Sequence, residues 1–528
     1  MHRAPRSWRA RRQPRALAAG AALALLLAAA PTASAQFYEK VDVGAASAAM
    51  LRDSLSGEQV GTGAFVAGLS GLQDPALEPL FRAMAAGSRP GARVYGILGV
   101  ALATRKGLDP ALVAGLTNAD ERAAIVREAN VSGILRDSPV DVILAQGNFS
   151  PAATLTLVGE LHRRRAPWDP AAILATASDK DPVAAGAASL LLLAKGQTQP
   201  WEEYRKRLEA MPEGTRSETL RALCEAALIF EIKQACVPLL ALATGPGISD
   251  DTLGAAIGLA LRLDTPAGVE AWNARVAQKR SQAQLVRAGL QLLASADRGV
   301  PPESFDKIRN GNPVVEAIAD TGIVLARKGD AAAALIKLLE LGHPMSAEWA
   351  LVRASDLPPE EGAKVWKHIA SRLDDQDPAN RPTGPLVAGL AREMIKTDPA
   401  AVAALAAKIK GTGALEVAIL SGLYDARRAE AVPIATSMRG AMPRAGESIA
   451  VLLLAREGKP LTAADMDLLG RAGAGGGDLD AVRQTQAAWL FVKRSAKSAD
   501  EAVARILNAP ATGATGSGAP AAPAKKAS

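Results

Sequence analysis

Side chains that commonly carry out catalysis or bind metals are sparse in this sequence. Only three of the four histidines follow the first 35 residues, and they are His162, His343 and His368. They form neither an HExxH motif nor a pair at the spacing of zinc ligands, so the familiar zinc-dependent reactions have no visible ligands. No GxSxG motif marks a nucleophilic serine. The sequence therefore predicts no catalytic residue, no bound metal and no cofactor.

Carboxylates cluster at three places, but none of the clusters predicts acid–base catalysis. Two pairs of glutamates, at 202–203 and 360–361, are adjacent on predicted helices, so their side chains point about 100° apart and cannot face one substrate. A third cluster has enough oxygen ligands for a cation but lacks the glycine and the terminal glutamate of an EF-hand. We therefore interpret its members as caps at helix ends, and they are Asp374, Asp375 and Asp377.

A run of basic residues and two tryptophans form the candidate surface for a partner. The run at 162–165, His-Arg-Arg-Arg, could bind an anion or an acidic partner, although a solvated helix end is the simpler interpretation. Trp168 and Trp201 each follow a proline at a predicted turn, where they could line a groove for a peptide or a sugar, or pack at a junction between repeats. The candidate side chains are Arg163, Arg164, Arg165, Trp168 and Trp201.

The two cysteines of the chain, Cys224 and Cys236, lie on either side of a predicted helix turn. If the turn centres on Phe230, the two thiols lie level on adjacent helices and can form a disulfide. If it centres on Lys233, an offset of roughly 6 Å of helical rise separates them too far for a bridge. A disulfide and two buried free thiols therefore both remain open.

The helices that position these residues follow a pattern that is clear between Val315 and Leu341, VEAIADTGIVLARKGDAAAALIKLLEL. Apolar residues recur at helical spacing on both sides of a central Lys-Gly-Asp. Gly329 is expected to end the first helix in a left-handed conformation, and Asp330 to cap the second. A hairpin of two amphipathic helices cannot bury its apolar faces alone, so such units must stack on one another.

Turns of this kind recur about every 35 residues, as two helices of about 14 residues with short connections require. They are centred at Asp74, Asp109, Asn148, Gln197, Lys233, Asp264, Arg298, Asp330, Pro358, Asp398, Arg428, Lys459 and Ser498. Asp-Pro dipeptides at or near several of them are start signals for helices. The longest interval, 148–197, is expected to hold an extra short helix or a break in the stacking. The predicted fold class is all-α, an α-α superhelix (solenoid) of roughly thirteen helical hairpins.

The two ends of the chain differ from this periodic region. Residues 1–35 contain a basic leader, an apolar run and the small-residue pattern Ala-Ser-Ala, which predict a signal peptide cleaved after Ala35. We therefore expect an exported protein, periplasmic or secreted. Residues 36–59 are expected to form an N-terminal cap segment, residues 60–508 the repeat domain, and residues 509–528 a disordered tail rich in Ala, Pro and Gly.

The leader also bears on the export route and on the partners. Its Arg11-Arg12 pair suits the twin-arginine route, but Pro14 and Arg15 favour the general pathway. Its six arginines leave on cleavage, so a net charge of +7 falls to +1, which predicts no nucleic-acid partner. No stretch after the leader reaches the roughly 18 unbroken apolar residues of a membrane span.

Individual units resemble known helical repeats. The small and turn positions of a tetratricopeptide repeat are matched by Gly322, Gly329, Asp330 and Ala334. The unit departs from that family where large aromatics are expected, with Ile318, Leu325 and Leu338 in their place, and Pro344 comes about two residues early. Other units, such as VAGLSGLQDPALEPLFRAM around Asp74, resemble HEAT-like repeats. The resemblance covers about residues 60–507 and implies a stacked α-solenoid that carries no catalytic residue.

This architecture and the leader predict a non-catalytic binding or scaffolding protein with an extended surface for a protein or peptide partner. The alternative is a periplasmic carbohydrate-active enzyme acting on peptidoglycan or polysaccharide, because α/α superhelices and toroids also occur in such enzymes. That enzyme needs two carboxylates in a cleft lined with aromatics, and aromatics supply only 3% of this chain. The binding function is therefore the preferred hypothesis.

Overall fold

The computed structural model of the chain describes residues 43–55, 62–278, 281–374, 381–409, 413–440, 444–475 and 479–509. These ranges are filled by helices and their connections, and no described residue lies in a β-strand. The prediction of an all-α protein is therefore confirmed. Its physical basis is the abundance of alanine and leucine, which lose little conformational freedom in a helix.

The chain divides into two compact units. Unit 1 consists of Met1–Leu112 and Leu454–Ser528, and unit 2 of Val113–Leu453. The division falls within α6 (Pro110–Ala114) and α26 (Arg444–Arg456). The predicted repeat region of residues 60–508 therefore contributes helices to both units.

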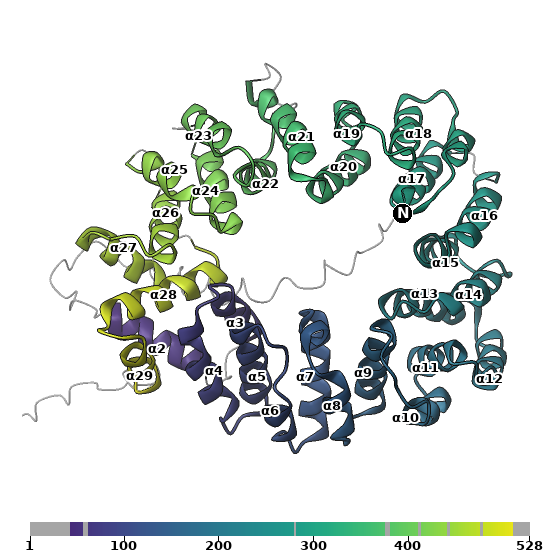
Figure 1. The fold of residues 1–528 in the computed structure, drawn as a ribbon, viewed down its shortest axis with the longest axis horizontal. Helices are drawn as coiled ribbons and strands as arrows, with labels where there is room; N and C mark the ends of the chain where they lie inside the picture. The colour runs from purple at the N-terminus through teal and green to yellow at the C-terminus, as the bar shows by residue number, and fades with distance from the viewer. Residues whose placement is uncertain are drawn as a thin grey trace, which may run out of the picture. The chain divides into compact units, whose positions relative to one another are not determined.

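Unit 1 combines helices from both ends of the chain. They are α2 (Val43–Leu55), α3 (Thr62–Ser70), η2 (Pro75–Leu77), α4 (Glu78–Ala85), α5 (Pro90–Thr104), α27 (Ala463–Gly473), α28 (Ala481–Ser495) and α29 (Ala499–Leu507). Helix α28 packs against α2 and α3, and α2 also contacts α27 and α29. Figure 1 shows the yellow C-terminal helices beside the purple N-terminal ones. Leu51, Leu69 and Trp489 are fully buried on these helices, so the first and last described helices share one core.

Polar contacts join the two ends of the chain within unit 1. Asp74 accepts hydrogen bonds from the indole Nε1 of Trp489 at 2.8 Å and from Nζ of Lys493 at 2.7 Å. The same carboxylate caps η2 by accepting a bond from the backbone N–H of Ala76. Gln486 donates a bond of 2.7 Å to the carbonyl of Gly68. These bonds fix the position of α28 on the N-terminal helices.

Unit 2 is a longer succession of helices. They are α7 (Ala119–Val131), η3 (Ile134–Asp137), α8 (Val140–Ala145), α9 (Pro151–Arg163), α10 (Ala171–Leu174), η4 (Ala175–Ser178), α11 (Pro182–Ala194), α12 (Gln199–Glu209), α13 (Glu213–Ile229), η5 (Lys233–Ala235), α14 (Cys236–Ala243), α15 (Asp250–Leu263), α16 (Thr265–Val276), α17 (Gln282–Leu293), η6 (Ala296–Arg298), η7 (Pro302–Ile308), α18 (Pro313–Ala326), α19 (Ala331–Glu340), α20 (Pro344–Asp356), α21 (Pro359–Ser371), η8 (Arg372–Asp374), α22 (Gly384–Met394), α23 (Pro399–Lys408), α24 (Ala414–Ala426) and α25 (Ala431–Met438).

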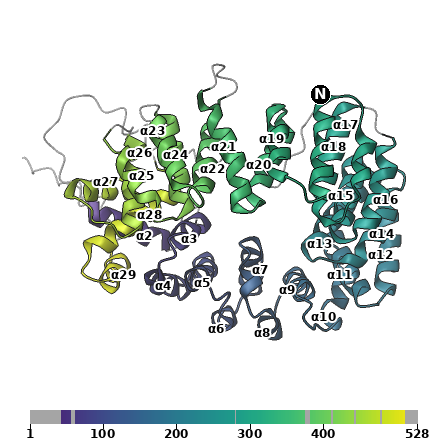
Figure 2. The same ribbon diagram turned by 45° about the horizontal axis from the view of Figure 1, so that its top comes forward.

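Helices of unit 2 pack on their near successors in the chain. α9 packs on α11, α11 on α13, and α13 on α15, while α12, α14 and α16 each pack on a helix of this row (Figure 2). The apolar run at residues 190–192 explains the central place of α11, because its leucines are completely buried. Further along, α17 packs on α18, α19 on α21, and α22 on α24. Each helix therefore buries its apolar face against neighbours that are close in sequence.

The predicted turns agree with the structure. All thirteen predicted turn centres lie between two α-helices or in the short 3-10 segments that connect them. The capping role of the Asp-Pro dipeptides is confirmed at five of the six, where the carboxylate accepts a bond from a backbone N–H of the first turn, at Asp74, Asp109, Asp169, Asp181 and Asp398. The sixth, Asp377, lies outside the described residues. The extra short helix expected within 148–197 is present as α10 and η4.

One local prediction is wrong. Lys328, with φ of 55°, takes the left-handed conformation at the end of α18, and Gly329 does not. Gly329 instead donates its N–H to the carbonyl of Val324, while Lys328 donates to Leu325, the two bonds of a Schellman motif. A Cβ on Gly329 would lie 3.1 Å from the side chain of Val324, so the space here is tight. Asp330 caps α19 as predicted.

Candidate functional site

Three helices of unit 2, α9, α11 and α13, end in the same way and pack on one another. Each ends in a Schellman motif, in which the second residue after the helix is left-handed. These left-handed residues are Arg165, Gly196 and Glu231, with φ of 58°, 84° and 55°. Because α11 packs on both α9 and α13, equivalent positions at the three C-terminal ends come together.

A pocket of about 350 Å³ lies at these helix ends. It is lined by His162, Arg163, Arg165, Ala166, Trp168, Ala194, Lys195, Glu231, Lys233 and Gln234. The first five come from the end of α9 and its following turn, the next two from the end of α11, and the last three from the connection between α13 and α14. Four cationic side chains and one carboxylate therefore face a single opening.

Arg163 and Arg164 are held by a buried carboxylate. Glu160, on the last turn of α9, is 6% exposed and accepts hydrogen bonds from Nε of each arginine at 2.8 Å. Burial disfavours the charged form of Glu160, but the bonds from Arg163 and Arg164 outweigh it, so the pKa of this carboxyl is lowered. Arg164 also donates to the backbone carbonyls of Leu135 and Ser138, which attaches α9 to η3. Arg164 therefore has a structural role and does not line the pocket.

Trp168 forms the floor beneath a lysine. The Nζ atom of Lys195 lies 4.8 Å from the centroid of the Trp168 ring, and the His162 ring meets the same indole edge-on at 6.3 Å. Trp168 is only 9% exposed, so its face is covered. The pKa of His162 is lowered, first by burial and then by the charge of Lys195, so this histidine is neutral at pH 7.

The charges around the pocket are partly compensated. Glu160 shares its single negative charge between Arg163 and Arg164, and Asp264 lies 4.0 Å from Lys233. Arg165 and Lys195 are exposed and form none of the ion pairs found among the described residues, whereas Glu231 contributes one negative charge. Each helix C-terminus adds roughly half a negative charge. The positive groups at the opening that are free to meet a ligand are therefore Arg165 and Lys195.

Trp201, the other tryptophan of the candidate surface, lies elsewhere. It is 3% exposed on α12, with its ring centroid 5.9 Å from that of Tyr204. Tyr204 in turn donates its hydroxyl to the carbonyl of Pro182 at 2.8 Å and packs on Gly186 of α11. The structure thus brings Arg163, Arg165 and Trp168 together at the pocket and leaves Trp201 in the core.

Three charged residues of the pocket were not among the sequence candidates, namely Lys195, Glu231 and Lys233. Lys195 occupies the same position after α11 that Arg164 occupies after α9. The signal that could have found it is the basic residue at the equivalent position after the next helix of the row. Because the three helix ends lie far apart in the chain, no local sequence pattern shows that they meet.

The two cysteines are free thiols and both are buried. The turn between them has its left-handed residue at Glu231, between the two centres considered from the sequence. Burial raises the pKa of Cys224 to about 12 and that of Cys236 to about 11, so both thiols are protonated at neutral pH.

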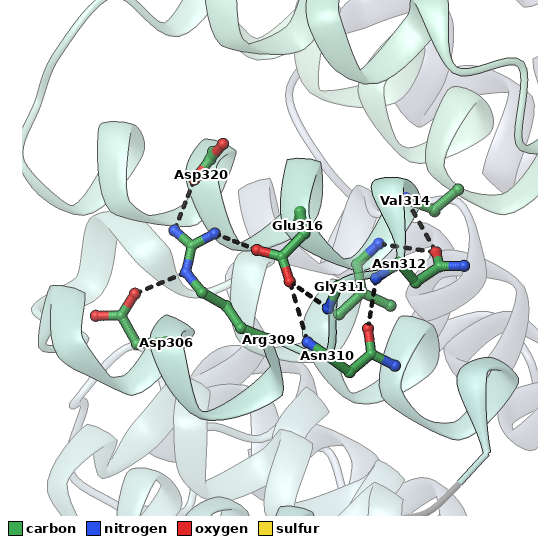
Figure 3. A network of polar contacts seen from close by, with 9 residues as sticks. Asp306, Arg309, Asn310, Gly311, Asn312, Val314, Glu316 and Asp320 are labelled. Atoms are coloured by element: carbon green, nitrogen blue, oxygen red, sulfur yellow. Dashed lines mark hydrogen bonds and ion pairs between the residues drawn. The ribbon is translucent and has the colours of Figure 1, made fainter.

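A second polar cluster, around Arg309, is satisfied internally (Figure 3). The guanidinium donates to Asp306 at 2.9 Å and to Glu316 and Asp320 at 2.6 Å each. The other oxygen of Glu316 accepts the backbone N–H groups of residues 310 and 311. The hydrogen bond from Arg309, and after it these backbone bonds, lower the pKa of Glu316. All these groups lie within residues 306–320. The cluster therefore stabilises the connection from η7 to α18.

The remaining candidates do not form a metal or membrane site in the described part of the chain. Within the described ranges, no three His, Cys, Asp or Glu side chains are placed to bind a metal ion. Asp375 and Asp377 lie outside these ranges, and Asp374 is the last residue of η8. Among the helices that the structure describes, none is long and apolar enough for a membrane span.

Comparison with protein-family models, with curated proteins and with solved structures found no match for this chain.

Proposed function

We propose that this chain is an exported, non-catalytic binding protein built as an α-solenoid, which offers a helical-repeat surface to a protein or peptide partner. The observation that carries the proposal is the row α9, α11, α13 and α15, in which each helix packs on the next. Repeats stacked in this way present equivalent positions side by side, and such surfaces suit extended partners. The pocket at the ends of α9, α11 and α13 is one product of that arrangement.

The proposal is tested with a random peptide library and the protein lacking residues 1–35. We expect selected peptides to bind with micromolar dissociation constants, about −8 kcal/mol. Hydrogen exchange should show that they protect backbone amides of unit 2. A protein that selects no peptide above background, at concentrations up to about 1 mM, would contradict the proposed function.

Export is part of the proposal, because the leader supports it. Protein recovered from outside the cytoplasm is expected to begin at Gln36, after removal of the six leader arginines. N-terminal sequencing checks this directly. A mature protein that still begins at Met1 would contradict export through a cleaved signal peptide.

The carbohydrate-active enzyme is the less favoured function. It requires open aromatic faces on which sugar rings stack, together with a pair of carboxylates. Trp168 is covered by Lys195 and Trp201 is buried against Tyr204, so neither tryptophan offers such a face. No observation on the described residues favours this function over peptide binding.

A further inference from the structure

The pocket at the ends of α9, α11 and α13 differs from an ordinary solvated helix end in how its cations are held. Lys195 is an exposed side chain, yet it lies over the ring of Trp168 at 4.8 Å. Arg163 is fixed by Glu160. Arg165 is the left-handed residue of the Schellman motif that ends α9, so its backbone position is set. Ordered cations lose less conformational entropy on binding an anion than free ones do.

We infer that this pocket binds the carboxylates of an acidic peptide segment, with Arg165 and Lys195 as the groups that contact them. The inference rests on the proposed peptide-binding function and names the chemistry of the ligand. The two side chains come from the ends of adjacent, packed helices and line one opening of about 350 Å³. That volume accommodates a few side chains of an extended peptide and not a folded domain.

Glu231 sets a limit on the ligand. It lines the same pocket from the α13 end, where its charge acts on both His162 and Arg163. A carboxylate on that side would be repelled, so the acidic side chains of the peptide lie towards Arg165 and Lys195. A backbone N–H or a basic side chain of the peptide is the group that suits Glu231. The pocket therefore favours an acidic segment over a free inorganic anion.

His162 makes the binding depend on pH. The charged groups that face it are Arg163 and Arg165 from α9, Lys195 from α11, and Glu231 and Lys233 from the α13–α14 connection. In the free protein this histidine is neutral at pH 7 and gains a proton only as the pH falls. A bound carboxylate stabilises the imidazolium, so proton uptake and peptide binding support each other. Glutamate side chains remain ionised at pH 5.5.

The inference is tested by fluorescence anisotropy with a rhodamine-labelled hexaglutamate peptide and the protein lacking residues 1–35. Hexalysine and a Gly-Ser hexapeptide with the same dye serve as comparison ligands. We expect saturable binding of hexaglutamate that weakens with added salt. Lys195→Glu and Arg165→Glu should each weaken it about tenfold, since each reverses a charge at the ligand. Lys195→Met keeps the stem over Trp168 and should weaken it about threefold.

Lys206→Glu is the matched control, because Lys206 is an exposed lysine on the neighbouring α12 and does not line the pocket. It makes the same change in net charge and should leave the affinity unchanged within about twofold. Lowering the pH from 7.5 to 5.5 should tighten binding about threefold in the wild type and have no such effect in His162→Gln. Circular dichroism spectra confirm that each variant is folded.

Two results would overturn the inference. One is that hexaglutamate binds no better than the Gly-Ser peptide, and the other is that Lys195→Glu, Arg165→Glu and Lys206→Glu all bind like the wild type. If library peptides still bind to unit 2 in either case, the proposed function stands and only the pocket assignment fails. If no library peptide binds, the proposed function fails with it.

Discussion

Three consecutive arginines at the end of α9 have three different environments. Arg163 and Arg164 share the buried carboxylate of Glu160, and Arg164 also bonds to two carbonyls of the preceding segment. Arg165 is exposed and lines the pocket. The difference comes from the neighbours that each side chain reaches. Residues three and four apart share a helix face, so Glu160 reaches Arg163 and Arg164 but not Arg165.

Glu160 provides a prediction that depends on pH. Because the folded pKa of Glu160 lies below its ordinary value of 4.5, its stabilising contribution is complete above pH 4.5 and is lost as the pH falls through the folded pKa. Glu160→Gln should therefore lower the free energy of unfolding by about 2 kcal/mol at pH 7, and by much less near pH 3. Urea unfolding followed by circular dichroism at both pH values measures this.

Glu203→Gln is the control for this change. Glu203 is exposed on α12, and its carboxylate accepts a hydrogen bond from the side chain of Gln199, one turn earlier. Its replacement should change the free energy of unfolding by less than about 0.5 kcal/mol at either pH. Equal effects of the two substitutions at pH 7 would show that Glu160 does not hold the end of α9.

The cysteines give a second prediction at the residue scale. Burial keeps both thiols protonated, with pKa values of about 12 and about 11, so the reactive thiolate is scarce at pH 8. We expect the native protein to react with Ellman's reagent at least 100-fold more slowly, by order of magnitude, than the unfolded protein. In denaturant without reductant, the reaction should count two thiols per chain. A count of zero would indicate a disulfide.

At the scale of elements, glycines set how closely the helices approach. Helices α22 and α24 meet at Gly422, where an added Cβ would lie 2.0 Å from the backbone oxygen of Ala388. Such a contact involves backbone on both sides, so no side-chain rotation relieves it. Gly389 lies one residue further along α22, and an added Cβ there meets nothing within 4 Å.

These two glycines form a matched pair for mutation. Gly422→Ala should lower the free energy of unfolding by about 3 kcal/mol, because α22 and α24 must separate to admit the methyl group. Gly389→Ala should raise it by about 0.5 to 1 kcal/mol, because alanine loses less backbone entropy in a helix. Denaturant unfolding of both variants measures the difference. Destabilisation of similar size in both would mean that α22 and α24 are not in backbone contact.

At the scale of the whole molecule, the main feature is that unit 1 combines helices from both ends of the chain. The chain leaves this unit after Leu112 and returns to it at Leu454. Helix α28 packs on α2 and α3, and Trp489 on α28 is fully buried with its N–H bonded to Asp74. The N-terminal helices of unit 1 therefore complete their core only with the last helices of the chain.

Asp74 provides the test of this long-range contact. Asp74→Ala removes the acceptor for Trp489 and Lys493 as well as the cap of η2, and should lower the free energy of unfolding by about 3 kcal/mol. Asp109→Ala removes a cap alone, at Ala111, and should cost about 1 kcal/mol. Thermal unfolding of the two variants compares them. Equal losses would mean that the bonds between the two ends contribute nothing.

The helices and their turns could be predicted because their signals are local. An Asp-Pro dipeptide caps a helix through atoms two or three residues away, and an apolar face repeats within one or two turns. Even so, the left-handed residue after α18 is Lys328 and not the predicted Gly329, because the hydrogen bonds of the Schellman motif, and not residue type alone, set its position. The pocket was predicted only in part, since Lys195 and Glu231 lie 30 or more residues along the chain from Arg163 and Arg165, with which they line the pocket.

The sequence by itself determined that the chain is helical, where the thirteen predicted turns lie, and that basic residues gather at the end of the helix before Arg164 and Arg165. Only the tertiary structure decided which of these ends come together, that Trp201 is buried while Trp168 lies beneath Lys195, and that the two ends of the chain share a core. The physical reason is that an apolar helix face has the same sequence signature whichever helix covers it. The partner is selected by the fit of side chains and glycine contacts across the interface, which no local pattern records.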